Sequence, residues 1–439
     1  MNDRIEELQK LGISLPEILL PAEHIDLAKW SVVACDQYTS EPEYWEEVSA
    51  IVGESPSTLK LILPECYLAE ESNPQRIAGV QQTMQNYLDS GIFRKAPGGA
   101  YIVVRRLPSK PTRTGLLLNI DLECYDYNRE STTPIRSTEG TIVTRIPARK
   151  QIRIGAPLEL PHVMVLLDDP GRTVIEPLAR AATGTTPVYS VQLMKNGGSI
   201  EAYRITSQEK LKDMVKAFHT IADKEMFKAR YHAENPFFIA IGDGNHSLAA
   251  AKAYWEELKA TLPKERIATH PGRFALVEAV NLYDDGISFE PIHRLFFDVE
   301  AGRLLEHLTE KDATRFVPLD GQSARLREPG PGEMGFVSPE RTGIIRFVTG
   351  SASETTAKAQ QLIDSFLCGL ESRLDFVHDL HRALELAQKP RNACCVMPRI
   401  TKAEFFGFIV ENGPYPRKSF SMGESNEKRY YMEARILKT

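Results

Sequence analysis

The segment from Ile239 to Ser247 holds the densest group of residues that could do chemistry, and it reads IAIGDGNHS. A continuous apolar run ends there at two glycines, and a helical pattern follows. Such a turn leaves unpaired backbone N–H groups at a helix N-terminus, where an anion is favoured. Asp243 could orient a hydroxyl or a metal ion, and His246 could move a proton or bind a phosphate. A plain turn with Asp243 or Asn245 as the helix N-cap explains the spacing equally well, since the segment matches neither the P-loop nor the GxGxxG fingerprint.

A second candidate runs from Ile135 to Arg153, where one carboxylate, Glu139, stands among several cations. The cations are Arg136, Arg145, Arg149, Lys150 and Arg153. A lone acid among bases could act as a general base whose cationic neighbours hold phosphates. Charge-rich stretches are usually solvated surface strands, so the residues alone favour that simpler interpretation.

Weaker candidates lie toward the C-terminus. The segment RKSFSMGE, which starts at Arg417, interleaves cations with hydroxyls and suits phosphate contacts, although a basic tail strand has the same pattern. His293 and Arg294 follow an apolar stretch, where a structural histidine bonded to the backbone is the simpler interpretation. His378 and His381 have the i, i+3 spacing of a helical metal site. Because no third ligand is indicated nearby, we expect a solvated helix face there.

The hydrophobic pattern around these candidates predicts both helices and strands. Helices are expected over 73–91, 208–231, 248–258, 355–370 and 374–387, and strands over 101–104, 116–122, 237–241 and 405–410. Strands mixed with intervening helices indicate an α/β or α+β fold. In such a fold the strand at 237–241 leads directly into the glycine turn.

The length of 439 residues suggests two or three domains, or one large α/β unit. We expect an α/β core over residues 1–300, which carries Glu139 and the motif from Asp243 to His246. Residues 301–350 are expected to be an elaboration or a mobile loop region, because the stretch from Gln322 to Glu333 is rich in proline, glycine and charge. Residues 351–439 should add a helical pair and a C-terminal strand segment that completes the site.

The composition restricts the class of partner. Lys and Arg total 53 against 59 Asp and Glu, which gives a net charge of −6. Constitutive nucleic-acid binders usually carry a basic excess, so the charge argues against such a partner. The six cysteines show no Cys-x-x-Cys spacing, which favours free thiols in a reducing compartment. No apolar stretch has the length of a signal peptide or a membrane span, so we expect a cytoplasmic protein without a membrane partner.

Four motifs in order resemble the domain-of-unknown-function 1015 family. They are TGLLLNIDLECYDY with IRSTEGT downstream, GDGNHS after FFIAI, EPIHRLF, and PRKSFSMGE. The resemblance extends from about Pro21 to the end of the chain. That family in turn resembles the ParB/sulfiredoxin superfamily, whose members hold nucleotide phosphates with a Gly-x-His-Arg-like turn at a helix N-terminus. The resemblance therefore implies a ParB/sulfiredoxin-like catalytic core with large family-specific elaborations.

By motif, the family also resembles the free-serine kinases, which combine a His-Glu segment, an Asp-Gly-His-His-Arg turn and a late Lys-Thr pair. This resemblance implies that Glu139 is the catalytic carboxylate and that Arg145 ends its segment. It places the Asp of the turn at Asp243 and the second His at His246, where they would position the substrate or Mg²⁺. The residue before the catalytic Glu is Thr138 here, in place of His.

The turn itself departs from the family pattern at two positions. The first His is Asn245, and the Arg is Ser247, which cannot replace a bidentate cation. Either Arg136 or Arg417 fills that space, or the phosphate specificity differs. The backbone from Gly244 onward would still offer its amides to a phosphate.

The late Lys-Thr pair falls on Lys418 and Ser419. In the implied mechanism, Glu139 accepts the proton of a hydroxyl, while Lys418, Arg145 and the amides near Asn245 stabilise the transferring phosphate. Phosphoryl transfer needs mainly positioning and charge neutralisation, which cations from distant parts of the chain can supply.

We therefore expect a small-molecule phosphotransferase that acts on a hydroxylated metabolite. By resemblance, serine or phosphoserine is the leading substrate, and ATP or ADP with Mg²⁺ is the cofactor. Two alternatives stay open. One is a ParB-like nucleotide-binding switch or DNA-binding protein, against which the acidic net charge argues. The other is a non-catalytic metabolite-binding relative, which the substitution at Ser247 makes credible.

Overall fold

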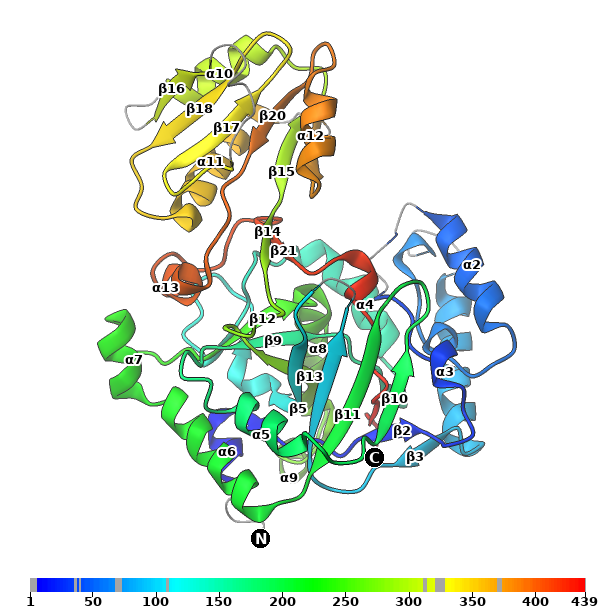
Figure 1. The fold of residues 1–439 in the computed structure, drawn as a ribbon. Helices are drawn as coiled ribbons and strands as arrows, with labels where there is room; N and C mark the ends of the chain where they lie inside the picture. The colour runs from blue at the N-terminus through cyan, green and yellow to red at the C-terminus, as the bar shows by residue number, and fades with distance from the viewer. Residues whose placement is uncertain are drawn as a thin grey trace. The chain divides into compact units, whose positions relative to one another are not determined.

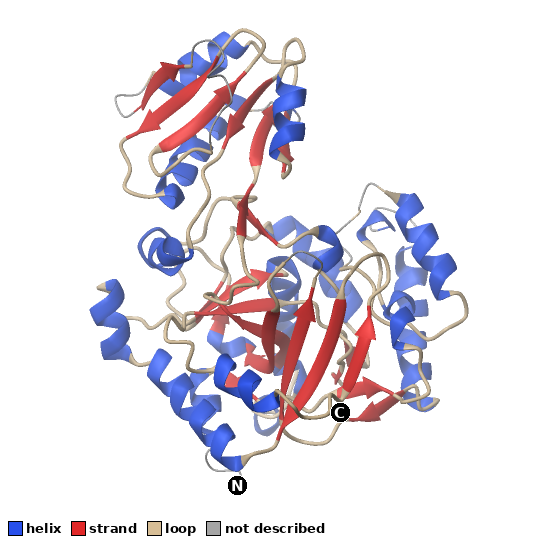
Figure 2. Cartoon of the chain, in the orientation of Figure 1, coloured by secondary structure: helices blue, strands red, loops and turns tan. Residues whose placement is uncertain are grey.

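The computed structural model describes residues 6–34, 38, 41–67, 73–107, 110–310, 314–319, 328–368 and 373–438. The chain divides into two compact units, one of Met1–Ile287 with Glu424–Thr439 and one of Ser288–Gly423. Both contain helices and strands, which confirms a mixed α/β fold (Figures 1 and 2). The units differ from the three predicted segments, because the C-terminal segment returns to the first unit and pairs with its strands. Part of the predicted loop, residues 322–327, lies outside the described residues.

A large mixed sheet forms the centre of the first unit (Figure 1). Its strands run in the order β10 (Tyr189–Gln192), β11 (Ser199–Ile205), β4 (Ala100–Arg106), β5 (Arg113–Asp121), β13 (Phe274–Asn281), β9 (Met164–Leu167), β12 (Ile239–Asp243), β7 (Ile135–Arg136) and β6 (Tyr125–Asp126), and β1 (Ile13–Ser14) pairs with β5. Short pairs also join β2 (Leu19–Pro21) with β3 (Phe93–Lys95) and β8 (Leu158–Glu159) with β22 (Arg435–Ile436). Most pairs are antiparallel, but β7 and β12 run parallel, so their carboxyl ends meet at one edge.

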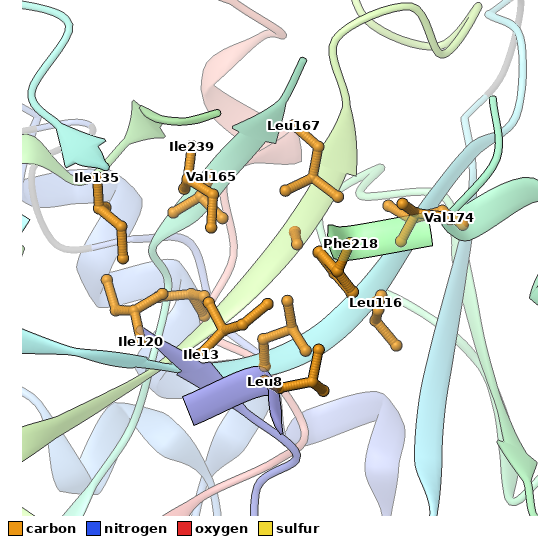
Figure 3. Packing of buried hydrophobic residues seen from close by; sticks show 14 of the residues in the cluster. Leu8, Ile13, Leu116, Ile120, Ile135, Val165, Leu167, Val174, Phe218 and Ile239 are labelled. Atoms are coloured by element: carbon orange, nitrogen blue, oxygen red, sulfur yellow. The ribbon is translucent and has the colours of Figure 1, made fainter. Parts of the chain in front are cut away.

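The helices of the first unit are α2 (Pro42–Val52), α3 (Asn73–Asp89), α4 (Ile146–Arg153), α5 (Ile175–Ala182), α6 (Gln208–Ile221), α7 (Lys224–Tyr231), α8 (Asn245–Lys259) and the short α9 (Lys264–Ile267). Of these, α5, α6 and α8 bury apolar side chains in a core that they share with the sheet, whereas α2 packs with residues outside the sheet such as Val33 and Ile62. The largest core cluster joins sheet residues such as Val165 and Ile239 to Phe218 of α6 and to Leu8 from the chain start (Figure 3). A single helix was predicted over 208–231. The structure instead has two, because the Asp223 side chain accepts from the amide of Met226 and starts α7.

The second unit is built on a separate six-stranded sheet. Its strands are β16 (Thr314–Pro318), β18 (Thr342–Phe347), β17 (Glu333–Val337), β20 (Ala393–Val396), β15 (His293–Phe296) and β19 (Leu374–Val377), in that order. Its helices are α10 (Ala301–Thr309), α11 (Ala352–Leu367), α12 (Leu380–Ala387) and α13 (Lys402–Asn412), and β14 (Phe289–Pro291) pairs with β21 (Phe420–Met422). Residues 301–350 therefore supply α10 and three strands of this sheet, as part of the unit's own core.

Two predicted elements of the second unit were wrong. The run from Phe405 to Val410 was expected to be a strand, but it lies inside α13. A capping box between Thr401 and Glu404 starts this helix, and the aromatic side chains are buried in helical geometry. The helix expected over 374–387 begins only at Leu380, since residues 374–377 form β19 and Asp379 is the N-cap of α12.

One buried acid in the first unit predicts an unusual pH dependence. Glu433 is 1% exposed, and its Oε1 accepts a hydrogen bond from the Tyr189 hydroxyl at 2.8 Å. Burial raises the pKa of Glu433 to about 7. The folded state therefore binds this proton more tightly than the unfolded state, and stability falls as the pH rises from about 4.5 to 7.

We predict that Glu433→Gln, which keeps the acceptor for Tyr189, removes this loss. At pH 8 the variant should be more stable than the wild type by roughly 3 kcal/mol, and at pH 4 the two should be equal. Denaturant unfolding of both proteins across this pH range measures the difference. A variant less stable at pH 8 would contradict the assignment of a buried neutral acid.

Candidate active site

The predicted glycine turn lies where two parallel strands end. In the register of β7 and β12, Ile135 is paired with Ile239 and Arg136 with Ala240. The chain leaves β7 into residues 137–145 and leaves β12 into the first turn of α8. Because carboxyl ends of parallel strands share an edge, these two segments come together although they are about a hundred residues apart in sequence.

Hydrogen bonds fasten the two segments to each other. The Ser137 hydroxyl lies 2.7 Å from Oδ1 of Asn245, and the Thr138 amide donates to the same oxygen at 3.3 Å. The Thr138 hydroxyl donates to the carbonyl of Ile241 at 2.6 Å, so that both segments are tied at the strand end as well. Ser137 and Thr138 are both buried, at 1% and 0% exposure. Asn245, which replaces the usual His of the motif, thus fixes the segment that carries Glu139.

Gly244 lets the chain turn from β12 into α8. It has φ of +85°, and a Cβ atom here would lie 2.9 Å from Cγ2 of Val163. The first intrahelical bond of α8 runs from the amide of Leu248 to the carbonyl of Gly244. The amides of residues 245–247 precede that bond and have no acceptor within the helix, which leaves them oriented for an anion.

We predict that Gly244→Ala distorts this turn. The left-handed conformation and the contact with Val163 together should lower the free energy of unfolding by about 1–2 kcal/mol and weaken anion binding. Gly79→Ala is the matched control, because Gly79 lies within α3 with no atom within 4 Å of the added Cβ, and alanine favours a helix. Thermal unfolding of both variants measures the effect. A Gly244→Ala protein as stable as the Gly79→Ala protein would refute the required backbone geometry.

Asp243 closes the strand and pairs with a lysine from the end of the chain. Its Oδ1 accepts from the amide of Gly244 at 2.8 Å, and its Oδ2 lies 3.3 Å from Nζ of Lys428. Lys428 is half-buried and belongs to the C-terminal segment that returns to the first unit. The turn therefore has a fixed carboxylate with a cation beside it.

Two histidines hold the first turn of α8. Nε2 of His246 accepts from the amide of Ile142 at 3.2 Å, which fixes the loop after Glu139. Nε2 of His162 lies 3.0 Å from the Ser247 hydroxyl, and its ring meets that of Tyr430 edge-on at 4.9 Å. His162 was not among the predicted site residues. The one signal for it was its position just before the apolar run that forms β9.

The predicted base and its neighbouring cation lie in the loop after β7. Glu139 is half-buried, and its carbonyl oxygen lies 2.7 Å from the Ser137 hydroxyl. Arg145 is exposed at the start of α4, and its carbonyl accepts from Nη1 of Arg149. Both residues are thus in the segment that the turn of α8 fastens, and their chemical roles stay predictions.

Arg136 does not fill the space of the missing arginine. Its Nε donates to the carbonyl of Thr133 at 2.7 Å and its Nη2 to the carbonyl of Asn235 at 3.1 Å. The guanidinium also lies over the Phe237 ring, 4.9 Å from its centre. Asn235 and Phe237 precede β12, whereas the turn follows it, so this side chain points to the other end of the strand. Burial without a carboxylate partner lowers the pKa of Arg136 to about 10, which fits a structural role.

The three predicted phosphate ligands near the C-terminus belong to the second unit. Arg417 and Lys418 are exposed in the turn before β21, and Lys418 has a left-handed φ of +58°. Ser419 is buried, and its hydroxyl donates to the carbonyl of Pro416 at 2.6 Å. Nη1 of the fully buried Arg294 donates to the Lys418 carbonyl and fixes the turn. Their part in the site stays a prediction.

Among the residues that the structure describes, no group of three or more His, Cys, Asp or Glu side chains could hold a metal ion. His378 precedes the N-cap of α12, so it does not share a helix face with His381. No helix in the same described part has the length and apolar character that crossing a bilayer requires.

The fold and the turn define a mixed α/β protein in which a strand-to-helix turn is fastened to a neighbouring parallel strand. The chain belongs to the family described as "Protein of unknown function (DUF1015)", which matches residues 18–433 and confirms the predicted family. No curated protein sequence matches the chain significantly.

Several solved structures are similar to parts of the chain. A conserved hypothetical protein from Pyrococcus furiosus has 12% identity and a TM-score of 0.37, over 72% of this chain and 93% of its own. A free serine kinase in complex with AMP has 13% identity and a TM-score of 0.39, over 75% and 95%. SbnI with a C-terminal truncation, from Staphylococcus aureus, has 8% identity and a TM-score of 0.36, over 70% and 82%.

Proposed function

We propose that this protein transfers a phosphoryl group between a nucleotide and a small hydroxylated metabolite. The observation that carries the proposal is the fastening of the Glu139 segment to the first turn of α8 through Ser137 and Asn245. This arrangement gathers a carboxylate, helix N-terminal amides and the Lys428 cation at one sheet edge. Phosphoryl transfer depends mainly on positioning and charge neutralisation, and this set is suited to both.

In the proposed reaction, Glu139 accepts the proton of the acceptor hydroxyl. The hydroxyl oxygen bonds to the γ-phosphorus of ATP, the bond from that phosphorus to the bridging oxygen breaks, and ADP leaves. The amides of the first turn of α8 hold the non-bridging oxygens, because the N-terminus of a helix favours an anion. Lys428 adds positive charge next to the turn.

Mg²⁺ would enter with the nucleotide and neutralise its phosphates. Protein sites for nucleotide-bound Mg²⁺ use one or two carboxylates and leave the remaining positions to phosphate and water. The carboxylate of Asp243 would meet that requirement, and one of its oxygens already lies 3.3 Å from Nζ of Lys428.

The finer assignments rest on the motif resemblance. On that basis we propose serine or phosphoserine as the leading substrate, ATP or ADP as the nucleotide, and a ParB/sulfiredoxin-like core for the first unit. On the same basis we propose phosphate contacts by Arg145, Gly244 and Ser247 of the first unit. The resemblance assigns the same role to Arg417, Lys418 and Ser419, which belong to the second unit.

Ligand-dependent thermal unfolding tests the proposal. The purified protein is heated with ATP, ADP, CTP, phosphate, serine or phosphoserine, each with and without Mg²⁺. A ligand at a hundred times its dissociation constant adds about 2.7 kcal/mol of stability, which shifts the melting temperature measurably. Stabilisation by an adenine nucleotide and by serine or phosphoserine supports phosphotransfer. Stabilisation by CTP alone would favour a nucleotide switch, and no shift with any of them would overturn the proposal.

Lys428→Ala provides a site-specific prediction for the same assay. The variant should bind nucleotide about 10-fold more weakly, because a charge-assisted contact contributes on the order of 1.5 kcal/mol. Lys438→Ala, ten residues on and exposed, should bind like the wild type. Equal affinities of the two variants would exclude Lys428 from the nucleotide site.

A further inference from the structure

A cavity of about 140 Å³ lies beside the first turns of α8 in the first unit. The side chains that line it come from α3, α4, α8 and β13, from residues 61–63 and 156–163, and from the C-terminal segment of this unit. Most are apolar, and they include Leu61, Met84, Leu158, Leu248, Ala251 and Leu276. The cavity therefore belongs to the fold of this unit and adjoins the turn of the proposed site.

The size and lining of the cavity favour a compact hydrocarbon group. An engineered cavity of about 150 Å³ with a Leu, Ile and Phe lining stays dry and binds benzene. The cavity here has a closely similar volume and a mainly apolar lining, with polar side chains such as Arg153, Glu159 and Ser247 on part of its wall. One ring, or a branched chain of about the same size, would fill it.

Several polar groups on its wall are paired with protein partners, although Nε of Arg153 is buried without a hydrogen-bond partner. Nη1 of Arg153 donates to Oε1 of Glu159 at 2.6 Å, and the Ser247 hydroxyl lies 3.0 Å from Nε2 of His162. Nη1 of Arg149 donates to a backbone carbonyl at 3.0 Å. A buried nucleobase needs partners for its ring nitrogens and exocyclic groups, and burying them without partners is costly. The mainly apolar wall offers few such partners, so it favours a hydrocarbon group over a base.

Ser247 connects the cavity with the proposed phosphate site. Its side chain lines the cavity, while its amide is among those that precede the first intrahelical bond of α8. In the more usual motif, position 247 is an Arg. Such a long side chain would occupy the space where the Ser247–His162 pair now forms part of the cavity wall. A bound molecule can therefore direct a phosphate or hydroxyl to the turn and a hydrocarbon group into the cavity.

We propose that this cavity binds a compact hydrocarbon group of the phosphoryl acceptor. The inference rests on the proposed function and narrows its substrate class to hydroxylated metabolites that carry one ring-sized apolar substituent. The occupant is amphipathic, with its polar end at residues 245–247 and its apolar end between α8, α4 and α3.

Comparing inorganic phosphate with phenyl phosphate tests the inference, with binding measured by calorimetry on the full-length protein. Phenyl phosphate should bind at least about 10-fold more tightly, because its ring leaves water for the cavity. Ala250→Leu or Ala156→Leu puts extra volume into the cavity, and the ratio of the two affinities should fall toward one. Ala253→Leu is the control on α8, since Ala253 does not line the cavity, and it should keep the ratio.

The outcomes separate this inference from the proposed function. If phosphate binds and phenyl phosphate binds no more tightly, the cavity is not part of the substrate site, while the phosphate site stands. If the wild-type preference persists in both cavity-filling variants, the ring lies elsewhere and the inference fails. If neither ligand binds, the phosphate site and the inference that rests on it both fail.

Discussion

Replacement of Glu139 by Gln is expected to lower kcat by about 100- to 10,000-fold, while nucleotide affinity changes little. General bases contribute rate factors of this size, and Gln keeps the shape of the side chain but cannot accept the proton. The fastening of the loop through Ser137 and Asn245 does not use the Glu139 carboxylate, so the turn should persist in the variant. Turnover is followed by phosphorus NMR with ATP and the acceptor that the ligand screen identifies.

Glu130→Gln is the matched control for this experiment. Glu130 is exposed, precedes β7 and belongs to the same stretch of chain, so its replacement should leave kcat unchanged. Equal turnover of Glu139→Gln and wild type would remove Glu139 from the chemistry. Loss of nucleotide binding together with turnover would instead assign it to ligand binding.

The second large effect is expected at Glu159, which is 8% exposed between two arginines. Its Oε1 accepts from Arg153 at 2.6 Å and its Oε2 from Arg435 at 2.8 Å. Arg435 comes from the C-terminal strand β22, so this network fastens that strand to β8. Glu159→Ala leaves two guanidinium groups without their buried counter-charge and should cost about 3–5 kcal/mol of unfolding free energy. Denaturant unfolding measures the loss.

The same carboxylate predicts acid sensitivity. Burial alone would raise the pKa of Glu159. The charges and hydrogen bonds of Arg153 and Arg435 lower this pKa by more than burial raises it, so it lies below its ordinary value. The folded state thus favours the ionised form, and this stability is present at neutral pH and lost as the pH falls toward the lowered pKa.

Glu257→Ala serves as the control for Glu159→Ala. Glu257 is mostly exposed and pairs with Lys150 at the surface, where such pairs contribute little. A Glu159→Ala protein that unfolds like the control would show that the buried network does not hold the C-terminal strand.

Much of the secondary structure of the first unit could be predicted, because local sequence signals mark where its helices and strands begin and end. The helix at 73–89 has Pro74 in its first turn and ends before Gly91, and the strand at 239–243 starts within the continuous apolar run 237–241. The run from Phe405 to Val410 was misread because five apolar residues around one glycine fit a buried strand and a buried helix equally. The capping box formed by Thr401 and Glu404 favours the helix, and this pair of residues was visible in the sequence.

The site shows the same division between local and long-range information. The turn at Asp243 and Gly244 could be predicted, since a strand, a glycine turn and a helix follow one another along the chain. The contact between Ser137 and Asn245 depends on the parallel pairing of β7 with β12, which no local pattern contains. His162 was missed for the same reason, because only the pairing of β9 with β12 brings it near Ser247. Arg136 was misassigned because its direction along β12 depends on contacts with Asn235 and Phe237.

The proposed function requires that nucleotide phosphates bind at the first turn of α8. Titration of isotopically labelled protein with ADP and Mg²⁺, followed by amide chemical shifts, tests it most directly. We predict that the largest shifts occur at the amides of Asn245, His246 and Ser247 and in the fastened loop at 137–139. Large shifts elsewhere, with these amides unchanged at saturating ADP, would contradict the account.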